Sequence, residues 1–376
     1  MTSPTPPAFL PGLQLSRVLY EEAVRPLLAE HYPGLPHAAA RVGPGSEVLG
    51  FDTARSADHE WGPRLELFLT AEDVTEHGAD IERLLAHRLP KEVRGWPTNF
   101  RPSPDPHDVA GLMAHTDGPV AHRVAVRDVG SWLADLGLTA EPTTADWLAM
   151  PAQRLAEATA GAVFHDGVGE LTAARAGLDW YPDEVWRWLL ACQWQRVAQE
   201  EAFPGRCAEV GDDLGAAVVA GRLVRDLMRL CLLYARRYPP YSKWLGSAFA
   251  RLPVAGELLP ALRGALAATG AALRERHLCD AAERVAALHN ESGLTAPLDP
   301  TRRPFHSRPF LVLDAGRFAR ELAGTVTEPA LRGLRLVGAV DQWVDNTDFL
   351  GDPVPARAAV RAALERRGGR EPDGVR

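Results

Sequence analysis

The sequence is poor in lysine, in cysteine and in long apolar runs. Only Lys91 and Lys243 are lysines among its 41 basic residues, so arginine richness alone does not indicate phosphate binding. The four cysteines have no C-x-x-C spacing, which argues against a zinc site and a disulfide framework. No segment approaches the roughly 20 apolar residues of a membrane span, and the Pro-rich start does not resemble a signal peptide. These absences predict a cytoplasmic protein with no membrane partner.

Several common catalytic motifs are missing as well. The sequence contains no Walker A motif, no G-x-G-x-x-G, no H-E-x-x-H and no G-x-S-x-G elbow. The formal net charge is -8, with a pI of about 5.9, whereas binding to a nucleic-acid backbone favours a dense basic face. Nucleic acid is therefore an unlikely main partner, and the common kinase, dinucleotide and hydrolase interpretations lose support.

The length of 376 residues exceeds what one hydrophobic core usually supports. The first 140 or so residues mix strand and helix patterns, with strands predicted at 38–42, up to 67–69 and at 120–129. A Pro-rich stretch of little periodicity covers 96–117. Helices are predicted at 13–32, where Pro26 should kink or end the helix, at 80–89 and at 130–138.

From residue 144 onward the apolar residues recur at helical spacing, with almost no strand signal. The helices predicted there cover 147–157, 184–203, 211–238, 243–250, 258–278 and 279–292. The fold class is therefore predicted to be α+β, with a mixed sheet flanked by helices and then an α-helical bundle. The predicted domains are 1–143, 144–296 and a C-terminal extension, 297–376, with a frayed tail.

The segment Gly45–Trp61 carries the chemistry. It begins at Gly45-Ser46, where a strand gives way to a turn, and it ends with Asp58 and Glu60, two positions apart. Side chains at i and i+2 of a strand share a face, so both acids are predicted to point the same way. Carboxylates suit Mg²⁺, which often bridges protein acids to substrate phosphates, and a Gly-Ser turn can present backbone N–H groups to those phosphates.

These residues resemble the polymerase-beta-like nucleotidyltransferase superfamily. Its signature is a Gly-Ser turn, a gap, and an Asp-x-Asp or Asp-x-Glu pair. The gap here is residues 47–57, and the longer run Gly-Ser-Glu-Val-Leu-Gly-Phe-Asp-Thr, followed by Ser-x-Asp-His-Glu-Trp-Gly-Pro-Arg, resembles a bacterial family of unknown function within that superfamily. The resemblance extends to Trp194-Gln195-Arg196 and to Asp341-Gln342-Trp343-Val344-Asp345. It implies a nucleotidyltransferase-like N-terminal domain and a helical domain similar to those of antibiotic nucleotidyltransferases.

The resemblance also implies roles for individual residues. Asp58 and Glu60 would bind Mg²⁺, and Gly45, Ser46 and Arg64 would hold a nucleoside triphosphate, probably ATP. A third acid often assists in the superfamily; Asp128 is the first candidate and Glu201 the second. Lys243, one of only two lysines, follows a Tyr-Pro-Pro-Tyr turn and is predicted to contribute to catalysis and nucleotide binding.

Two functions follow from this pattern. The first is transfer of a nucleotidyl group, probably adenylyl, from the Mg²⁺-bound triphosphate to an unidentified small-molecule or protein acceptor. The alternative is a catalytically silent nucleotide-binding or interaction protein that keeps the same fold but lacks the third acid. The sequence names neither the acceptor nor the base preference, because acceptor choice depends on loop geometry.

Overall fold

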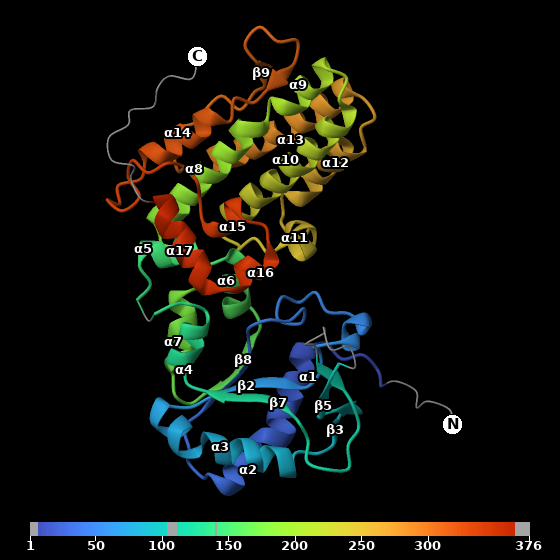
Figure 1. Ribbon diagram of the computed structural model, residues 1–376, viewed down its shortest axis with the longest axis vertical. Helices are drawn as coiled ribbons and strands as arrows, with labels where there is room; N and C mark the ends of the chain where they lie inside the picture. Colours follow the sequence, from blue (N-terminus) through green and yellow to red (C-terminus); the bar gives the residue numbers. More distant parts are fainter. Residues whose placement is uncertain (1–6, 104–110, 140, 365–376) are drawn as a thin grey trace. The chain divides into compact units, whose positions relative to one another are not determined.

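The computed structural model describes residues 7–103, 111–139 and 141–364 of the chain (Figure 1). The chain divides into two compact units, each of which is described separately. Unit 1 consists of Met1–Glu141 and Arg154–Asp179, and unit 2 of Pro142–Gln153 and Trp180–Arg376. Helix α6 (Ala152–Thr159) contains the point where the chain passes from unit 2 back to unit 1. Residues 104–110 of the Pro-rich stretch lie outside the described residues.

These units differ from the predicted domains in two places. Residues 154–179 return to unit 1, because strand β8 (Ala162–Asp166) pairs with β1 (Ala38–Arg41). The predicted extension 297–376 clusters with the helical unit, where α14 (Gly316–Gly324) packs along α8 (Asp183–Glu200). A five-residue strand carries too little periodicity to stand out inside a helical stretch, so the sequence did not reveal it.

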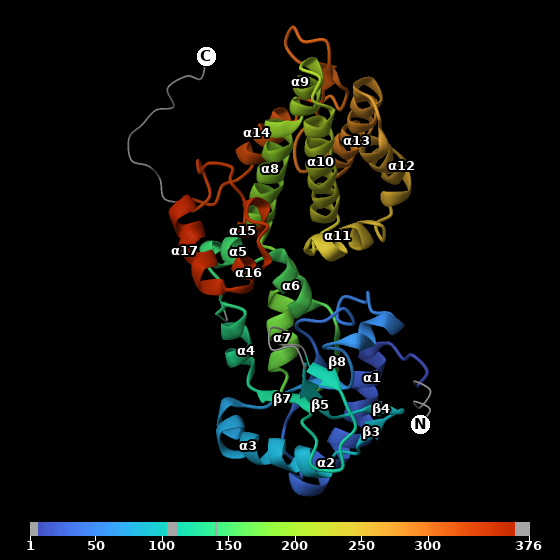
Figure 2. The same cartoon turned by 45° about the vertical axis from the view of Figure 1, so that its right-hand side comes forward.

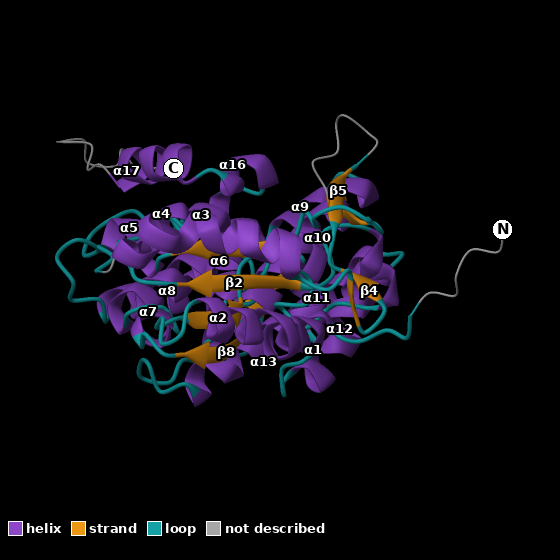
Figure 3. Cartoon of the chain, turned by 90° about the horizontal axis from the view of Figure 1, so that it is seen from below, coloured by secondary structure: helices purple, strands orange, loops and turns teal. Residues whose placement is uncertain are grey.

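Unit 1 is built on a four-stranded mixed sheet in the order β7-β2-β1-β8. Strand β1 runs antiparallel to both β2 (Arg64–Phe68) and β8, whereas β2 runs parallel to β7 (Arg123–Arg127). In Figure 3 these strands are drawn in orange, β2 and β8 among those labelled. The mixed sheet with its helices, followed by the helical bundle, confirms the predicted α+β class.

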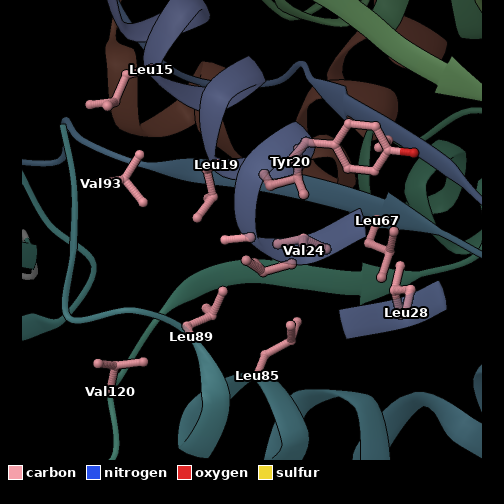
Figure 4. Close-up of a cluster of buried hydrophobic side chains, with 14 of the residues drawn as sticks. Leu15, Leu19, Tyr20, Val24, Leu28, Leu67, Leu85, Leu89, Val93 and Val120 are labelled. Carbon is pink, nitrogen blue, oxygen red and sulfur yellow. The ribbon is translucent and has the colours of Figure 1, made fainter. Parts of the chain in front are cut away.

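One face of the sheet forms the apolar core of unit 1. Leu65 and Leu67 of β2 and Val124 of β7 pack there against helices α1 (Gly12–Val18) and α3 (Ala71–Arg88). Figure 4 shows this cluster, with Leu67 of β2 and Leu85 of α3 among the labelled side chains. Because successive side chains of a strand alternate between faces, the other residues of β2 point away from this core.

The opposite face of the sheet carries charge. In the parallel pairing of β2 with β7, Arg64 lies opposite Arg123 and Phe68 lies opposite Arg127. These side chains therefore lie on the same face of the sheet as Glu66. Helix α4 (Val129–Asp135) covers the end of this face, where the Phe68 and Trp132 rings meet edge to face at 5.8 Å. The sheet therefore separates an apolar face from a face rich in arginine.

The predicted N-terminal helix is present but irregular. α1 leads into a π-helical segment, Leu19–Val24, and then into α2 (Arg25–His31). Pro26 lies in the first turn of α2, where its missing N–H costs little. The expected interruption at Pro26 thus takes the form of a change in helical hydrogen bonding just before it.

Short elements complete unit 1. They are a 3-10 helix (Ala54–Asp58), β3 (Glu92–Val93), β4 (Trp96–Pro97), β5 (Phe100–Pro102), β6 (Gly111–Met113) and α7 (Glu170–Gly177). The pairs β3–β4 and β5–β6 are antiparallel. The described part of the Pro-rich stretch therefore contains three short strands, β4, β5 and β6, in place of a featureless loop.

Unit 2 is a helical bundle around α8, α10 (Asp213–Tyr234) and α13 (Ala271–Glu291), which pack together (Figure 2). Its other elements are α5 (Thr144–Ala149), α9 (Phe203–Glu209), α11 (Ser242–Phe249), α12 (Ala255–Ala267), β9 (Arg303–Pro304), β10 (Leu311–Val312), α15 (Val340–Trp343), α16 (Thr347–Gly351) and α17 (Pro353–Leu364). Gly270 separates α12 from α13, where one long helix was predicted up to residue 278. Across the described ranges, no helix combines the length and apolar character needed to cross a membrane.

Candidate functional site

The Gly-Ser turn follows β1 and is shaped by Gly45. Its φ of +153° belongs to a region that favours glycine, and it has no room for a side chain. A Cβ atom there would lie 2.5 Å from Glu47 Oε2, 2.6 Å from an Arg64 nitrogen and 2.7 Å from an Arg41 nitrogen. Glycine at this position therefore allows three charged side chains to converge under the turn.

Glu47 holds the turn together. Its Oε1 atom accepts hydrogen bonds from Arg41 Nε at 2.9 Å and from Arg64 at 2.5 Å. The Glu47 side chain is 1% exposed and that of Arg41 is 4% exposed. Burial raises the pKa of Glu47, but Arg41 and Arg64 outweigh burial and hold that pKa below its ordinary value. The three side chains form a buried ion cluster that fixes the position of Gly45-Ser46.

The acid pair of the motif does not lie on a strand, which corrects the sequence prediction. Asp58 is the last residue of the 3-10 helix, and Glu60 has a φ of +43°, so the period-two argument does not apply to them. A capping box between Thr53 and Ser56 starts the 3-10 helix. Pro63 has no N–H for a ladder, and β2 begins only at Arg64.

Trp61 anchors this segment in the core of unit 1. It is 2% exposed, and its Nε1 atom donates to Asp52 Oδ2 at 3.0 Å. The same carboxylate oxygen accepts from the Gly12 backbone N–H at 2.7 Å, so Asp52 braces the loop. The buried indole thus sets where the neighbouring Glu60 can project.

Glu60 is the motif acid that reaches the Gly-Ser turn. Its Oε2 atom lies 3.4 Å from Arg64 Nη1, and Arg64 Nη2 donates to the Pro44 carbonyl at 3.2 Å. Glu60 Oε1 lies 3.4 Å from Arg123 and accepts from the Gly111 backbone N–H. Asp58 is 68% exposed, and its carboxylate contacts the ring of His59 at 2.8 Å. The structure therefore joins Gly45, Arg64 and Glu60 in one place.

Further charge lies beside these residues on the same face of the sheet. Burial raises the pKa of Glu66, although Arg41, Arg127 and Arg64 oppose the rise. Arg127 Nη1 is 4.0 Å from Glu66. Arg64 is 13% exposed, whereas Arg123 is 45% exposed and lies over the Phe100 ring at 5.5 Å. Arg123 is thus the arginine of this group that solvent reaches most easily.

Asp128 does not join this group. It is the N-cap of α4, where its Oδ1 accepts from Ser131 N at 2.9 Å, and the Ser131 hydroxyl hydrogen bond lowers its pKa. It follows the end of β7, whereas Glu60 contacts Arg123 at the start of that strand. Five strand residues span about 13 Å at 3.3 Å per step, so the prediction of Asp128 as a partner of Glu60 is not supported.

The two candidate residues of unit 2 have other contacts. Lys243 lies in the first turn of α11, with its ammonium 5.0 Å from the centre of the Trp244 ring. Glu201 accepts backbone N–H groups from Leu313 at 3.0 Å, Asp314 at 3.1 Å and Ala315 at 2.8 Å. Glu201 therefore ties the start of α14 to the end of α8, which is a structural task.

Sequence reasoning missed Arg41, Glu47, Glu66 and Arg123. The alternation Arg64-Leu65-Glu66-Leu67 was a usable signal, because it marks a strand with one charged and one apolar face. Glu47 gave no such signal, since a buried acid beside a Gly-Ser turn looks like any loop residue. Within the described ranges, no three His, Cys, Asp or Glu side chains gather into a group that could hold a metal ion.

Comparisons with known proteins give two matches. Residues 147–245 match the profile of a domain of unknown function, DUF4037. No curated protein matches the chain. Among solved structures, a nucleotidyltransferase-like protein from Exiguobacterium sibiricum is similar at 11% identity, with 82% of this chain and 89% of that chain covered and a TM-score of 0.33. The expected resemblance to a family of unknown function thus agrees with the first match over residues 147–245.

Proposed function

We propose that unit 1 binds a nucleoside triphosphate with Mg²⁺ at Gly45-Ser46, Arg64 and Glu60, and that the protein transfers a nucleotidyl group, with adenylyl as the predicted one, to a small-molecule or protein acceptor. The observation that carries this proposal is the Arg64 guanidinium. It lies 3.2 Å from the Pro44 carbonyl and 3.4 Å from Glu60 Oε2, so both halves of the sequence motif meet at one side chain.

The triphosphate would be held by groups of the turn and of the adjacent strands. Arg64 and Arg123 offer planar guanidinium groups, which match phosphate oxygens with paired N–H donors. The glycine of the turn lets the backbone approach a ligand closely, and the Ser46 hydroxyl can donate to a phosphate oxygen.

The two acids would supply the ligands of a hard cation. Glu60 and Asp58 are 39% and 68% exposed, and both offer carboxylate oxygens, the donors that Mg²⁺ prefers. The Glu60 contacts with Arg64 and Arg123 are long, at 3.4 Å, so these arginines could turn from Glu60 to phosphate as a cation takes their place. Bound Mg²⁺ would neutralise negative charge on the triphosphate.

The reaction itself would be an in-line displacement at phosphorus. A hydroxyl of the acceptor would give up its proton to solvent and attack the α-phosphate, the bond from the α-phosphate to the bridging oxygen would break, and pyrophosphate would leave. Arg64 and Arg123 would hold the phosphates in position, and the Glu47 cluster would keep the turn fixed. Asp128 and Lys243 have no step in this proposal.

One observation favours the silent-binder alternative. Glu60 accepts hydrogen bonds from Arg64, Arg123 and the Gly111 N–H. An acid engaged in this way can brace a binding site without ligating a catalytic ion. Transfer of labelled α-phosphate to any component of a metabolite pool separates the two functions, because the silent protein binds the triphosphate and transfers nothing.

Binding is tested by thermal stability with each nucleoside triphosphate, with and without Mg²⁺. A ligand at one hundred times its dissociation constant should stabilise the wild type by about 2.7 kcal/mol. We expect Glu60→Gln to lose most of this thermal shift, because it removes a proposed metal ligand. Arg64→Gln should lose it as well, because it removes the guanidinium that connects Glu60 to the Gly-Ser turn.

Asp58→Asn should lose a smaller part of the thermal shift than Glu60→Gln, because Asp58 is the more exposed of the two proposed metal ligands. The matched control is Glu30→Gln, which changes an acid of α2 whose side chain is 61% exposed. This control should keep the full shift. The proposal fails if no triphosphate stabilises the wild type in Mg²⁺, or if Glu60→Gln responds like Glu30→Gln.

A further inference from the structure

Unit 2 contains a pocket with apolar walls. It lies among α8, α10 and α13, whose residues Val197, Leu223, Leu227, Leu278 and Ala282 line it. The empty space is about 480 Å³, including its open mouth.

The segment Phe310–Leu313 forms another wall and is held firmly. The Phe310 ring packs on Gly205, where an added Cβ would lie 2.5 Å from the ring. The Cys279 thiol lies 3.6 Å from the Leu311 carbonyl, and Glu201 accepts the backbone N–H of Leu313 at 3.0 Å. The pocket is therefore preformed, so binding would not require this wall to become ordered first.

All the charge in the lining is negative. Glu201 and Glu275 are its charged members, and none of the lining residues, every one of which is described, is basic. Burial raises the pKa of Glu201 to about 7, against the opposing effect of its backbone hydrogen bonds. Burial also raises the pKa of Glu275, which takes a backbone hydrogen bond from Leu311. Burial raises the pKa of the Cys279 thiol to about 12, so that group stays neutral.

We propose that this pocket binds a small organic cation, with an ammonium group beside Glu201 and Glu275 and an apolar body among Val197, Leu223 and Leu227. An anion would meet the negative charge of the two half-buried acids, and a neutral apolar molecule would gain nothing from it, whereas a cation complements it. An aliphatic amine satisfies the acids and covers the apolar walls. The inference is independent of the function proposed for unit 1.

The test is calorimetric titration of the full-length protein with n-butylamine, n-hexylamine and n-octylamine. Each added methylene should tighten binding about fourfold, the equivalent of roughly 0.8 kcal/mol of buried surface. n-Hexanol and hexanoate have bodies of similar length without the positive charge, so both should bind at least tenfold more weakly than n-hexylamine.

Two variants locate the site. Glu275→Gln should weaken n-hexylamine binding at least tenfold. Glu291→Gln, on the same helix but paired with Arg284 outside the pocket, should leave it unchanged. Ala282→Met should fill the pocket and abolish binding even if Glu275→Gln fails to fold, with circular dichroism as the check on folding. Equal binding of n-hexanol and n-hexylamine, or full binding by Ala282→Met, would overturn the proposal. The thermal shift that Mg²⁺ and triphosphate produce in Ala282→Met tests the function proposed for unit 1 separately.

Discussion

Glu47→Gln is expected to lower the free energy of unfolding by about 3–5 kcal/mol. The substitution keeps the size of the side chain but removes the charge that compensates Arg41 and Arg64. Breaking a buried ion pair by removing one partner leaves a buried charge unpaired, and this costs far more than losing a surface pair. Urea unfolding at neutral pH measures the effect.

The matched control for this loss is Asp58→Asn. It removes a carboxylate of the same loop, but one that is 68% exposed and contacts only His59 among the described ion pairs. Its free energy of unfolding should stay within about 0.5 kcal/mol of wild type. If the free energy of unfolding of Glu47→Gln lies within about 1 kcal/mol of the wild-type value, the ion cluster does not hold the turn.

The second large effect concerns His289 and acid. This ring is completely buried, and Tyr234 Oη and Thr295 Oγ1 lie 2.8 Å from its two nitrogens. Trp194 Nε1 donates to Tyr234, and Thr295 donates to the Ala296 carbonyl. This network assigns Nδ1 as the acceptor and Nε2–H as the donor, which is a neutral imidazole. A second ring proton would break the Tyr234 hydrogen bond.

Burial lowers the pKa of His289 from 6.5 to about 4. The unfolded chain therefore binds this proton before the folded chain does, so the His289 contribution is intact above pH 6.5 and is lost as the pH falls towards 4. At 1.36 kcal/mol per unit, the loss is about 3 kcal/mol at pH 4.

The measurement compares wild type with His289→Asn at pH 7 and pH 4. Carboxyl groups such as Glu201, whose pKa is raised to about 7, change stability in the opposite direction over this range. They cancel when the two proteins are compared. The stability advantage of wild type over the variant should shrink by about 3 kcal/mol on acidification. An advantage independent of pH would mean that His289 has the same pKa in the folded protein as in the unfolded chain, which would contradict its burial as a neutral ring.

The sequence predicted the fold class well, because long periodic helices such as α8 and α10 signal their own identity. The shorter elements were harder to predict. β8 has five residues and little alternation, and it forms because β1 offers an edge on which it can pair. That edge depends on tertiary structure, so no local sequence pattern could reveal the pairing. The same applies to the return of residues 154–179 to unit 1.

At the candidate site, the predicted turn and the predicted acid Glu60 do meet at Arg64, but the local structure of the acid pair differs from the prediction. Gly45 was identifiable because such turns need glycine, and Glu60 because it is paired with Asp58. The strand predicted for the two acids was wrong. A 3-10 helix that starts at the Thr53 capping box ends at Asp58, and β2 begins only at Arg64, after Pro63. Glu47 and Arg41 were hidden, because buried ion pairs depend on contacts that no spacing encodes.

The central claim is that a metal-bound triphosphate binds where Arg64 joins the Gly-Ser turn to Glu60. Crystals grown with Mn²⁺ and a non-hydrolysable ATP analogue test it directly, because Mn²⁺ replaces Mg²⁺ and scatters anomalously. We predict an anomalous peak within ligand distance of Glu60, with phosphate density against Gly45-Ser46 and Arg64. A triphosphate bound elsewhere, or a peak with Glu60 still paired to both arginines, would contradict the claim.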